Sequence, residues 1–162
     1  MQISLKETAA ELKAKQRIVI TAHVNPDGDA IGSSLGLAHA LQALGKDVQV
    51  FIDDDIPAAF SVLPGYELIG KPVDGQNIPA DLLVAVDVSL DRIGRVAELC
   101  TAPVLNIDHH VTNDGQAAKL YLDGKVTYLA KAAIVFVIHD DIEVIIPRNE
   151  SLVSNGSYRR PS

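Results

Sequence analysis

The sequence predicts an α/β fold in which a three-layer, mostly parallel β-sheet carries helices on both faces. Short apolar runs rich in Val, Ile and Leu alternate along the chain with segments whose apolar residues recur at helical spacing. The runs are continuous, which is typical of strands buried on both faces. Regular alternation of strand and helix favours parallel strands joined by right-handed crossovers. A chain of 162 residues with 48% hydrophobic content can bury the core of one such domain.

The first predicted elements are a helix over residues 4–15 and a strand over residues 17–22. Ser4 is a favoured N-cap residue, and Leu5, Ala9 and Leu12 fall on one face of the helix. The run that follows is apolar without interruption, which predicts a central strand rather than an edge strand.

A second helix and a second strand are predicted after a polar loop. Apolar residues from Ile31 to Leu44 recur at helical spacing, and Gly45 is placed to end this helix in a left-handed conformation. Residues 48–52 read as the next strand. Residues 56–80 are rich in Pro and Gly, which predicts an irregular segment with short helical pieces.

The remaining elements alternate in the same way. Residues 82–86 form a predicted buried strand, residues 92–99 a short helix, and residues 104–107 and 118–122 two further strands. Residues 131–146 are strongly apolar, and we expect either a helix that turns into a strand or two strands there.

Metal-competent side chains follow three of the predicted strands. They are His23, Asp27 and Asp29 after the first strand, Asp87 after the third, and Asp108, His109 and His110 after the fourth. Imidazole suits Mn²⁺ or Fe, and carboxylates suit Mn²⁺ or Mg²⁺. The carboxyl ends of parallel strands share one edge of a sheet, so we expect these side chains to converge. The sequence therefore predicts a divalent-cation site.

Each of these segments has a simpler interpretation when it is taken alone. The residues between His23 and Asp29 are turn formers, Asp87 could cap a helix, and Asp108 to His110 could be a polar turn. A flavodoxin-like nucleotide-binding protein would use Asp-rich loops in this way. That alternative leaves the joint occurrence of the three segments unexplained.

Taken together, the segments resemble the motifs of the DHH phosphoesterase family. The resemblance covers residues 1–125, with a first motif at residues 23–33, a second formed by Asp87 and residues 89–94, and a third at residues 108–110. Within the family, the sequence is most similar to the oligoribonuclease (nano-RNase) and 3'-phosphoadenosine 5'-phosphate (PAP) phosphatase type. That type includes enzymes that degrade cyclic dinucleotides or their linear products.

The resemblance implies a metal-dependent phosphoesterase that hydrolyses short oligoribonucleotides, PAP or dinucleotides with water activated by two metal ions, Mn²⁺ or alternatively Mg²⁺. It also implies roles for individual residues. His23 and Asp27 would bind one ion, Asp29 and His109 the other, Asp87 would bridge them, and His110 would act on the phosphate. Arg92, which follows Asp87 on the same edge, could contact a phosphate or form a salt bridge on the helix surface. Asn25 and Asp108 would orient ligands.

The sequence also departs from the family pattern. A fourth-motif aspartate and a glycine- and histidine-rich motif of a second, substrate-binding (DHHA1) domain are not found, and Asp140 and Asp141 match the fourth motif poorly. We therefore expect a truncated chain, with an atypical apolar segment at residues 126–147 and a flexible tail at residues 148–162. A catalytically silent domain that only binds metal or nucleotide, or a DHH-type inorganic pyrophosphatase, are the alternatives.

Composition restricts the remaining possibilities. A net charge of −7 argues against a broad basic surface for long nucleic acid, but not against a short nucleotide held by metal ions. The single cysteine, Cys100, excludes an intramolecular disulfide and is expected to pack as a small hydrophobe. Without a signal-peptide core or a long apolar stretch, we expect a cytoplasmic protein with no membrane contact. An uncovered apolar face would favour a homodimer.

Overall fold

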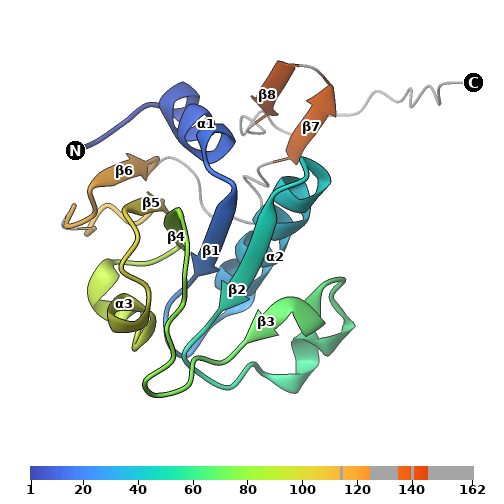
Figure 1. Cartoon of the computed structure of the whole chain (residues 1–162), viewed down its shortest axis with the longest axis vertical. Helices are drawn as coiled ribbons and strands as arrows, with labels where there is room; N and C mark the ends of the chain where they lie inside the picture. Colours follow the sequence, from blue (N-terminus) through green and yellow to red (C-terminus); the bar gives the residue numbers. More distant parts are fainter. Residues whose placement is uncertain (114, 125–134, 140, 146–162) are drawn as a thin grey trace, which may run out of the picture.

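The computed structural model describes residues 1–113, 115–124, 135–139 and 141–145. Its main element is a six-stranded sheet in the order β3-β2-β1-β4-β5-β6, in which every neighbouring pair is parallel (Figure 1). The strands are β1 (Arg17–Thr21), β2 (Asp47–Phe51), β3 (Ile69–Gly70), β4 (Leu82–Val86), β5 (Val104–Asp108) and β6 (Lys119–Leu122). The parallel sheet with helices confirms the predicted fold class.

Among the described residues, one α-helix precedes β1, and two further α-helices and three short 3₁₀ helices connect the strands of this sheet. They are α1 (Leu5–Ala14), α2 (Gly28–Ala43), η1 (Ala58–Val62), η2 (Tyr66–Leu68), η3 (Leu90–Arg92) and α3 (Val96–Leu99). The cap of α1 forms as predicted, because Ser4 and Glu7 make a reciprocal capping box. Gly45 follows α2 with a φ of 73°, as expected for the residue that ends the helix.

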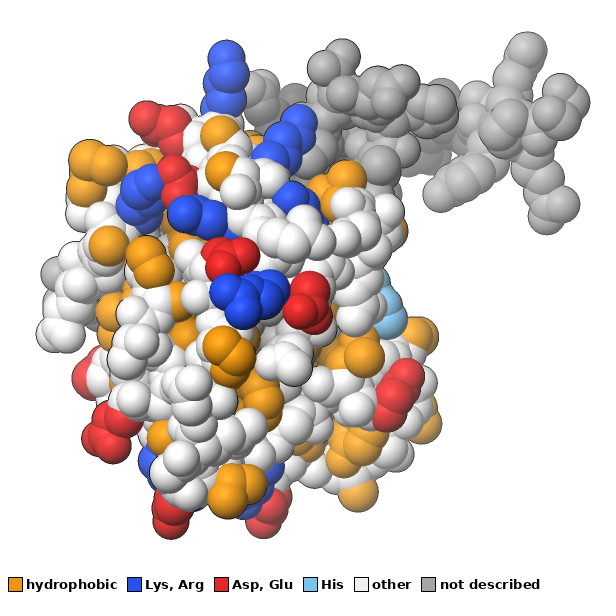
Figure 2. Space-filling view, in the orientation of Figure 1, with side chains coloured by type: hydrophobic (Ala, Val, Ile, Leu, Met, Phe, Trp, Pro, Cys, Tyr) orange, Lys and Arg blue, Asp and Glu red, His pale blue; other side chains and the backbone are white. Residues whose placement is uncertain are grey.

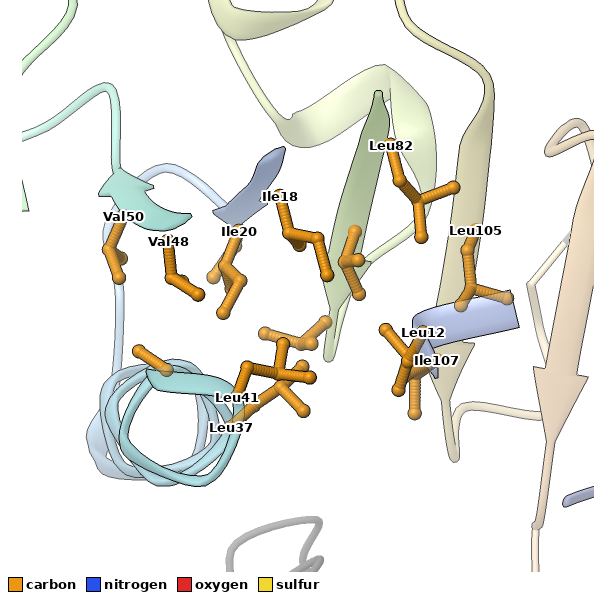
Figure 3. Close-up of a cluster of buried hydrophobic side chains, with 14 of the residues drawn as sticks. Leu12, Ile18, Ile20, Leu37, Leu41, Val48, Val50, Leu82, Leu105 and Ile107 are labelled. Carbon is orange, nitrogen blue, oxygen red and sulfur yellow. The ribbon is translucent and has the colours of Figure 1, made fainter. Parts of the chain in front are cut away.

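Two hydrophobic clusters fill the space on the two faces of the sheet. Successive strand residues point to opposite faces, so Ile18 and Ile20 pack on one side of β1 and Val19 packs on the other. Leu37 and Leu41 of α2 and Leu12 of α1 contact the first side (Figure 3). On the second side the cluster is completed by residues in and around α3, which are Ile93, Val96 and the buried Cys100. This arrangement gives the three layers.

The order of the strands reverses between β1 and β4. The chain moves outward from β1 to β2 and β3 on one side, and from β4 to β5 and β6 on the other. The crossover helices α2 and α3 consequently lie on opposite faces of the sheet. In an open parallel sheet, such a reversal leaves a crevice at the carboxyl ends of the two central strands, where ligands bind.

The structure corrects two predicted elements. The helix predicted at residues 92–99 is wrong as a single element, because Gly94 adopts a φ of 59° and separates η3 from α3. The close approach of Asp53 explains the glycine, since a Cβ at position 94 would lie 2.5 Å from the Asp53 Oδ2. The segment 56–80, predicted to be irregular, also contains the two-residue strand β3.

Two further strands, β7 (Val135–His139) and β8 (Asp141–Ile145), form an antiparallel pair. Of the two alternatives for the apolar segment, two strands are therefore confirmed for these residues. Residues 131–134, the predicted tail and the side chains of Asp140 and Asp141 lie outside the described part of the structure. Among the described residues, no helix combines the length and apolar character needed to cross a bilayer.

Replacing Gly94 with alanine should destabilise the chain. The new Cβ would sit at a positive φ and collide with Asp53, which is itself tied to Arg95 by hydrogen bonds. We expect a loss of about 1–3 kcal/mol in the free energy of unfolding, measured by urea titration. Gly36→Ala is the matched control, because a Cβ on this exposed glycine would meet nothing within 4 Å beyond the nearby backbone of α2, and alanine favours helix. Equal stability of the two variants would contradict the explanation.

Candidate metal centre

Carboxylates and imidazoles from three loops meet at the carboxyl edge of β1, β4 and β5. His109, which follows β5, places its Nε2 3.0 Å from the Asp87 Oδ1 and 3.6 Å from the Asp29 Oδ2. His23, which follows β1, places its Nε2 3.9 Å from the Asp27 Oδ1. The structure therefore brings together all five side chains for which the resemblance implied metal binding.

Asp87 belongs to both groups of ligand atoms at this edge. His23, Asp27 and Asp87 offer ligand atoms within 4.8 Å of one another, and so do Asp87, Asp108, His109 and His110. A carboxylate has two oxygens and can bind two cations about 3.5–4 Å apart, as in two-metal sites. Its place in both groups is what a bridging ligand requires.

The surroundings of Asp87 favour a bound cation. The residue is 2% exposed, and its buried Oδ1 accepts no hydrogen bond from the described residues, although the His109 Nε2 lies 3.0 Å away. Burial raises the pKa of Asp87 to about 6, the negative charges of Asp29 and Asp27 contribute to this, and His109 and His110 oppose it. Several carboxylates in a buried place repel one another, and a divalent cation would offset that repulsion. The residues present therefore fit a divalent metal ion.

The first loop is shaped by its own polar residues. Asp27 is the N-cap of α2, and its Oδ1 accepts hydrogen bonds from the backbone N–H groups of Asp29 (2.9 Å) and Ala30 (3.0 Å). Asn25 adopts a φ of 55°, and its backbone N–H donates to Asp54 at 2.8 Å. The Nδ1 of His23 lies 2.9 Å from the Val24 carbonyl, so a proton on Nδ1 leaves the Nε2 lone pair for a metal.

Asp87 does not act as a helix cap, so that simpler interpretation is wrong. Its φ is 57°, which non-glycine residues rarely adopt, and Ser89 rather than Asp87 precedes η3. The backbone N–H of Asp87 donates to the Ile107 carbonyl at 3.0 Å. The left-handed turn thus keeps the Asp87 backbone attached to β5 while the carboxylate joins the cluster.

Asp108 organises the two histidines of the third motif. Its Oδ1 accepts hydrogen bonds from the backbone of His109 (2.7 Å) and of His110 (3.1 Å), and lies 2.8 Å from the His110 Nδ1. Burial alone would raise the pKa of Asp108, but hydrogen bonds from Asn113, His110 and His109 outweigh it and lower that pKa. Half of the His110 side chain is exposed, unlike that of His109.

Arg92 is placed differently from the other predicted site residues. Its carbonyl accepts a hydrogen bond from the Val24 backbone at 2.9 Å, which attaches η3 to the loop that carries His23. The residue is exposed, and no ion pair joins its guanidinium to a carboxylate among the described residues. The backbone of Arg92 thus lies beside the site, and its role toward phosphate stays a prediction.

Two polar features near this edge were not predicted from the sequence. The buried Asn106 and the partly buried Asn113 form an amide pair beside Asp108, and the signal was Asn106, a polar residue inside the apolar run of β5. Asp53, which follows β2, is held by the side chain and the backbone N–H of Arg95, and these hydrogen bonds lower the pKa of Asp53. Because Arg95 also binds Asp74 at 2.6 Å, it braces the neighbouring loops outside the metal cluster.

In the metal-free protein, Asp87 should make stability fall as the pH rises. The pKa of Asp87 is about 6 in the folded chain against an ordinary value of 3.8, so between about pH 4 and pH 6 the unfolded chain loses this proton first. The protonated Asp87 therefore stabilises the folded chain below about pH 4, and this contribution to the free energy of unfolding is lost as the pH rises above the pKa of about 6 in the folded chain. Urea unfolding in a chelator should find Asp87→Asn more stable than the wild type at about pH 8, by up to about 3 kcal/mol, and equal to it at about pH 4.

Asp81→Asn is the matched control for this measurement. Asp81 directly precedes β4, at the end of the strand opposite to Asp87. Hydrogen bonds from the Arg17 backbone and side chain lower the pKa of Asp81. Its replacement should not stabilise the chain at about pH 8. An Asp87→Asn variant that is less stable than the wild type at that pH without metal would contradict the electrostatic account of the site.

Comparisons with known proteins identify relatives of this chain. A protein from Thermus thermophilus, described as bifunctional oligoribonuclease and PAP phosphatase NrnA, is 44% identical over 110 residues that cover 67% of this chain and 33% of that protein. A protein of the same description from Mycoplasma pneumoniae is 30% identical over 118 residues, covering 68% of this chain and 36% of that protein. The chain thus spans about a third of the length of these relatives.

A solved structure and a family model complete the comparison. The crystal structure of an exopolyphosphatase-related protein from Bacteroides fragilis superposes with a TM-score of 0.71 at 27% identity, over 80% of this chain and 42% of that one. The model of the DHH family, N-terminal domain, matches residues 17–151, which include the three motifs and the sheet edge on which they meet. The chain therefore belongs to the DHH family.

Proposed function

We propose that this chain is the metal-binding domain of a phosphoesterase that hydrolyses short oligoribonucleotides, PAP or dinucleotides. The observation that carries the proposal is the Asp87 carboxylate, which is buried, lies 3.0 Å from the His109 Nε2, and is shared by two groups of ligand atoms. The names of the Thermus and Mycoplasma relatives support oligoribonucleotide and PAP substrates.

In this proposal His23 and Asp27 hold one cation, Asp29 and His109 hold the other, and Asp87 bridges them. Mixed imidazole and carboxylate ligands favour Mn²⁺, while Mg²⁺ prefers oxygen ligands alone. When bound, the two ions would supply an acidified water for attack on phosphorus and would neutralise charge on the phosphoryl oxygens. The Nδ1 contact between His23 and the Val24 carbonyl would keep the His23 Nε2 available as a ligand.

His110 and Arg92 act on the phosphate in this proposal. Asp108 engages the His110 Nδ1 at 2.8 Å, so the Nε2 of this half-exposed ring is the atom that would meet a phosphoryl oxygen. The exposed guanidinium of Arg92, whose segment is attached to the His23 loop, would bind a second phosphate oxygen. Both groups would thereby stabilise the negative charge that develops on the phosphoryl group.

A short substrate suits the charge of this chain. The net charge is −7, and on the face seen in Figure 2 basic and acidic side chains are interspersed instead of forming one basic surface. Long nucleic acid normally requires clustered Lys and Arg to neutralise its phosphates. A short nucleotide needs compensation at one or two phosphates only, which the metal ions would provide.

A domain that binds metal or nucleotide without turnover is the second candidate. The matched residues cover 33% and 36% of the two relatives, whose names describe the activities of the whole proteins. Metal binding and hydrolysis must therefore be measured separately on this chain.

Hydrolysis of a diribonucleotide in the presence of Mn²⁺ is the direct test of the proposal. The wild type should release mononucleotide and bind two Mn²⁺ ions by calorimetry. Asp87→Asn should lower turnover by about a thousandfold or more, since the loss of the bridging carboxylate removes a ligand from both ions. Asp81→Asn, at the opposite end of the same strand, should retain both activities.

The outcomes separate the two candidates. Two bound Mn²⁺ ions without release of mononucleotide would favour the silent domain. A wild type that binds no Mn²⁺, or an Asp87→Asn variant as active as the Asp81→Asn control, would overturn both.

A further inference from the structure

A buried asparagine in β5 attaches to both sides of the Asp87 turn. Asn106 is 1% exposed, and its Nδ2 donates hydrogen bonds to the Ala85 carbonyl at 3.0 Å and to the Val88 carbonyl at 2.9 Å. These two carbonyls flank Asp87 in the chain. The turn that presents the carboxylate is therefore held from the neighbouring strand.

A second asparagine extends this network to the third motif. The Nδ2 of Asn113 lies 2.7 Å from the Asn106 Oδ1, 2.6 Å from the Asp108 Oδ2 and 3.3 Å from the Val88 carbonyl. Its Oδ1 accepts a hydrogen bond from the Gly115 backbone at 3.0 Å. Each amide nitrogen thus faces acceptors and each amide oxygen faces a donor, which defines the orientation of both side chains.

The network fixes groups that have few other constraints. Asp87 adopts a left-handed conformation that costs about 1 kcal/mol or more and must be held by its surroundings. One oxygen of Asp108 binds the His109 and His110 backbone, and Asn113 holds the other oxygen, so the carboxylate cannot rotate freely. The two loops that carry Asp87 and His109 are thereby joined through four polar side-chain and backbone contacts.

We propose that Asn106 and Asn113 are positioning residues that set the distance between the Asp87 carboxylate and the His109–His110 loop. The proposal rests on the proposed metal centre, because that distance would decide how far apart the two ions sit. If the amide pair only held the two loops together, its loss would weaken the binding of both ions alike. The second ion, held by Asp29 and His109, should therefore be the more sensitive to loss of the amide pair.

Asn113→Ala, made in the whole chain of 162 residues, is the variant that tests this role. Mn²⁺ binding by calorimetry should show the affinity for one ion lowered about 10- to 100-fold, as is usual when a group that orients a ligand is removed. The affinity for the other ion should change little. Electron paramagnetic resonance should show a weaker spin-coupled pair and more isolated Mn²⁺. The matched control is Asn77→Ala, since Asn77 is exposed and lies on the segment before β4, at the opposite end of that strand from Asp87.

A metal-free measurement makes the test independent of the proposed function. Ring ¹⁵N shifts of His110 report which nitrogen carries the proton, and the 2.8 Å contact with Asp108 favours Nδ1. In Asn113→Ala the freed Asp108 carboxylate should move these shifts toward a mixture of tautomers. Asn113→Ser is the milder variant if circular dichroism shows that alanine prevents folding.

The outcomes distinguish a failure of the proposed function from a failure of the positioning role of Asn106 and Asn113. A wild type that binds no Mn²⁺ overturns the proposed function, and the His110 shifts then decide the positioning role alone. A folded variant with wild-type His110 shifts, or with wild-type affinity for both ions, overturns the positioning role. Equal weakening of both ions together with a matching loss of stability also overturns it, because that is the result of a purely structural contact.

Discussion

The fold places a carboxylate where it is electrostatically unfavourable without a cation. Asp87 is buried at the point where the strand order reverses, beside Asp29 and Asp27, and its pKa is raised to about 6 mainly by burial. A buried ionised group with an unsatisfied oxygen costs several kcal/mol in general, and proteins keep such groups chiefly at functional sites. The rest of the candidate site is arranged around this constraint, since the histidines bring ring nitrogens to it and the helix N-cap brings a second carboxylate.

The parallel sheet is what allows distant residues to share this place. His23, Asp87 and His109 are separated by many residues in the chain but follow three strands that are adjacent in the order β1-β4-β5. Because the strands run in the same direction, their carboxyl ends meet at one edge, and only short extensions are needed to bring the side chains within contact. A helix covers each face of the sheet, so the edge is where polar groups can gather without burial in the apolar layers.

Much of this arrangement could be predicted from local patterns. The cap at Ser4, the end of α2 at Gly45 and the strands β1 and β4 follow from residue types and spacing that act over a few neighbours. The convergence of the ligand residues could also be predicted, since it depends only on parallel strands. The break at Gly94 could not, because it depends on Asp53, a residue distant in the sequence whose carboxylate occupies the space of a Cβ.

The amide network could not be predicted either, because it also depends on contacts between residues that are distant in the sequence. In this respect the predicted metal ligands differ from the residues that hold them in place. Ligand residues are recognisable in a sequence because few side chains bind metal, so their type alone carries information. Asn106 and Asn113 act through the geometry of amide bonds between two loops, and asparagine is common in turns and strand ends for other reasons. Their contribution becomes visible only when the Ala85 and Val88 carbonyls on one side and the Asp108 carboxylate on the other are seen to share them. Ligand identity can therefore be conveyed by sequence motifs, whereas ligand spacing is a property of the folded edge.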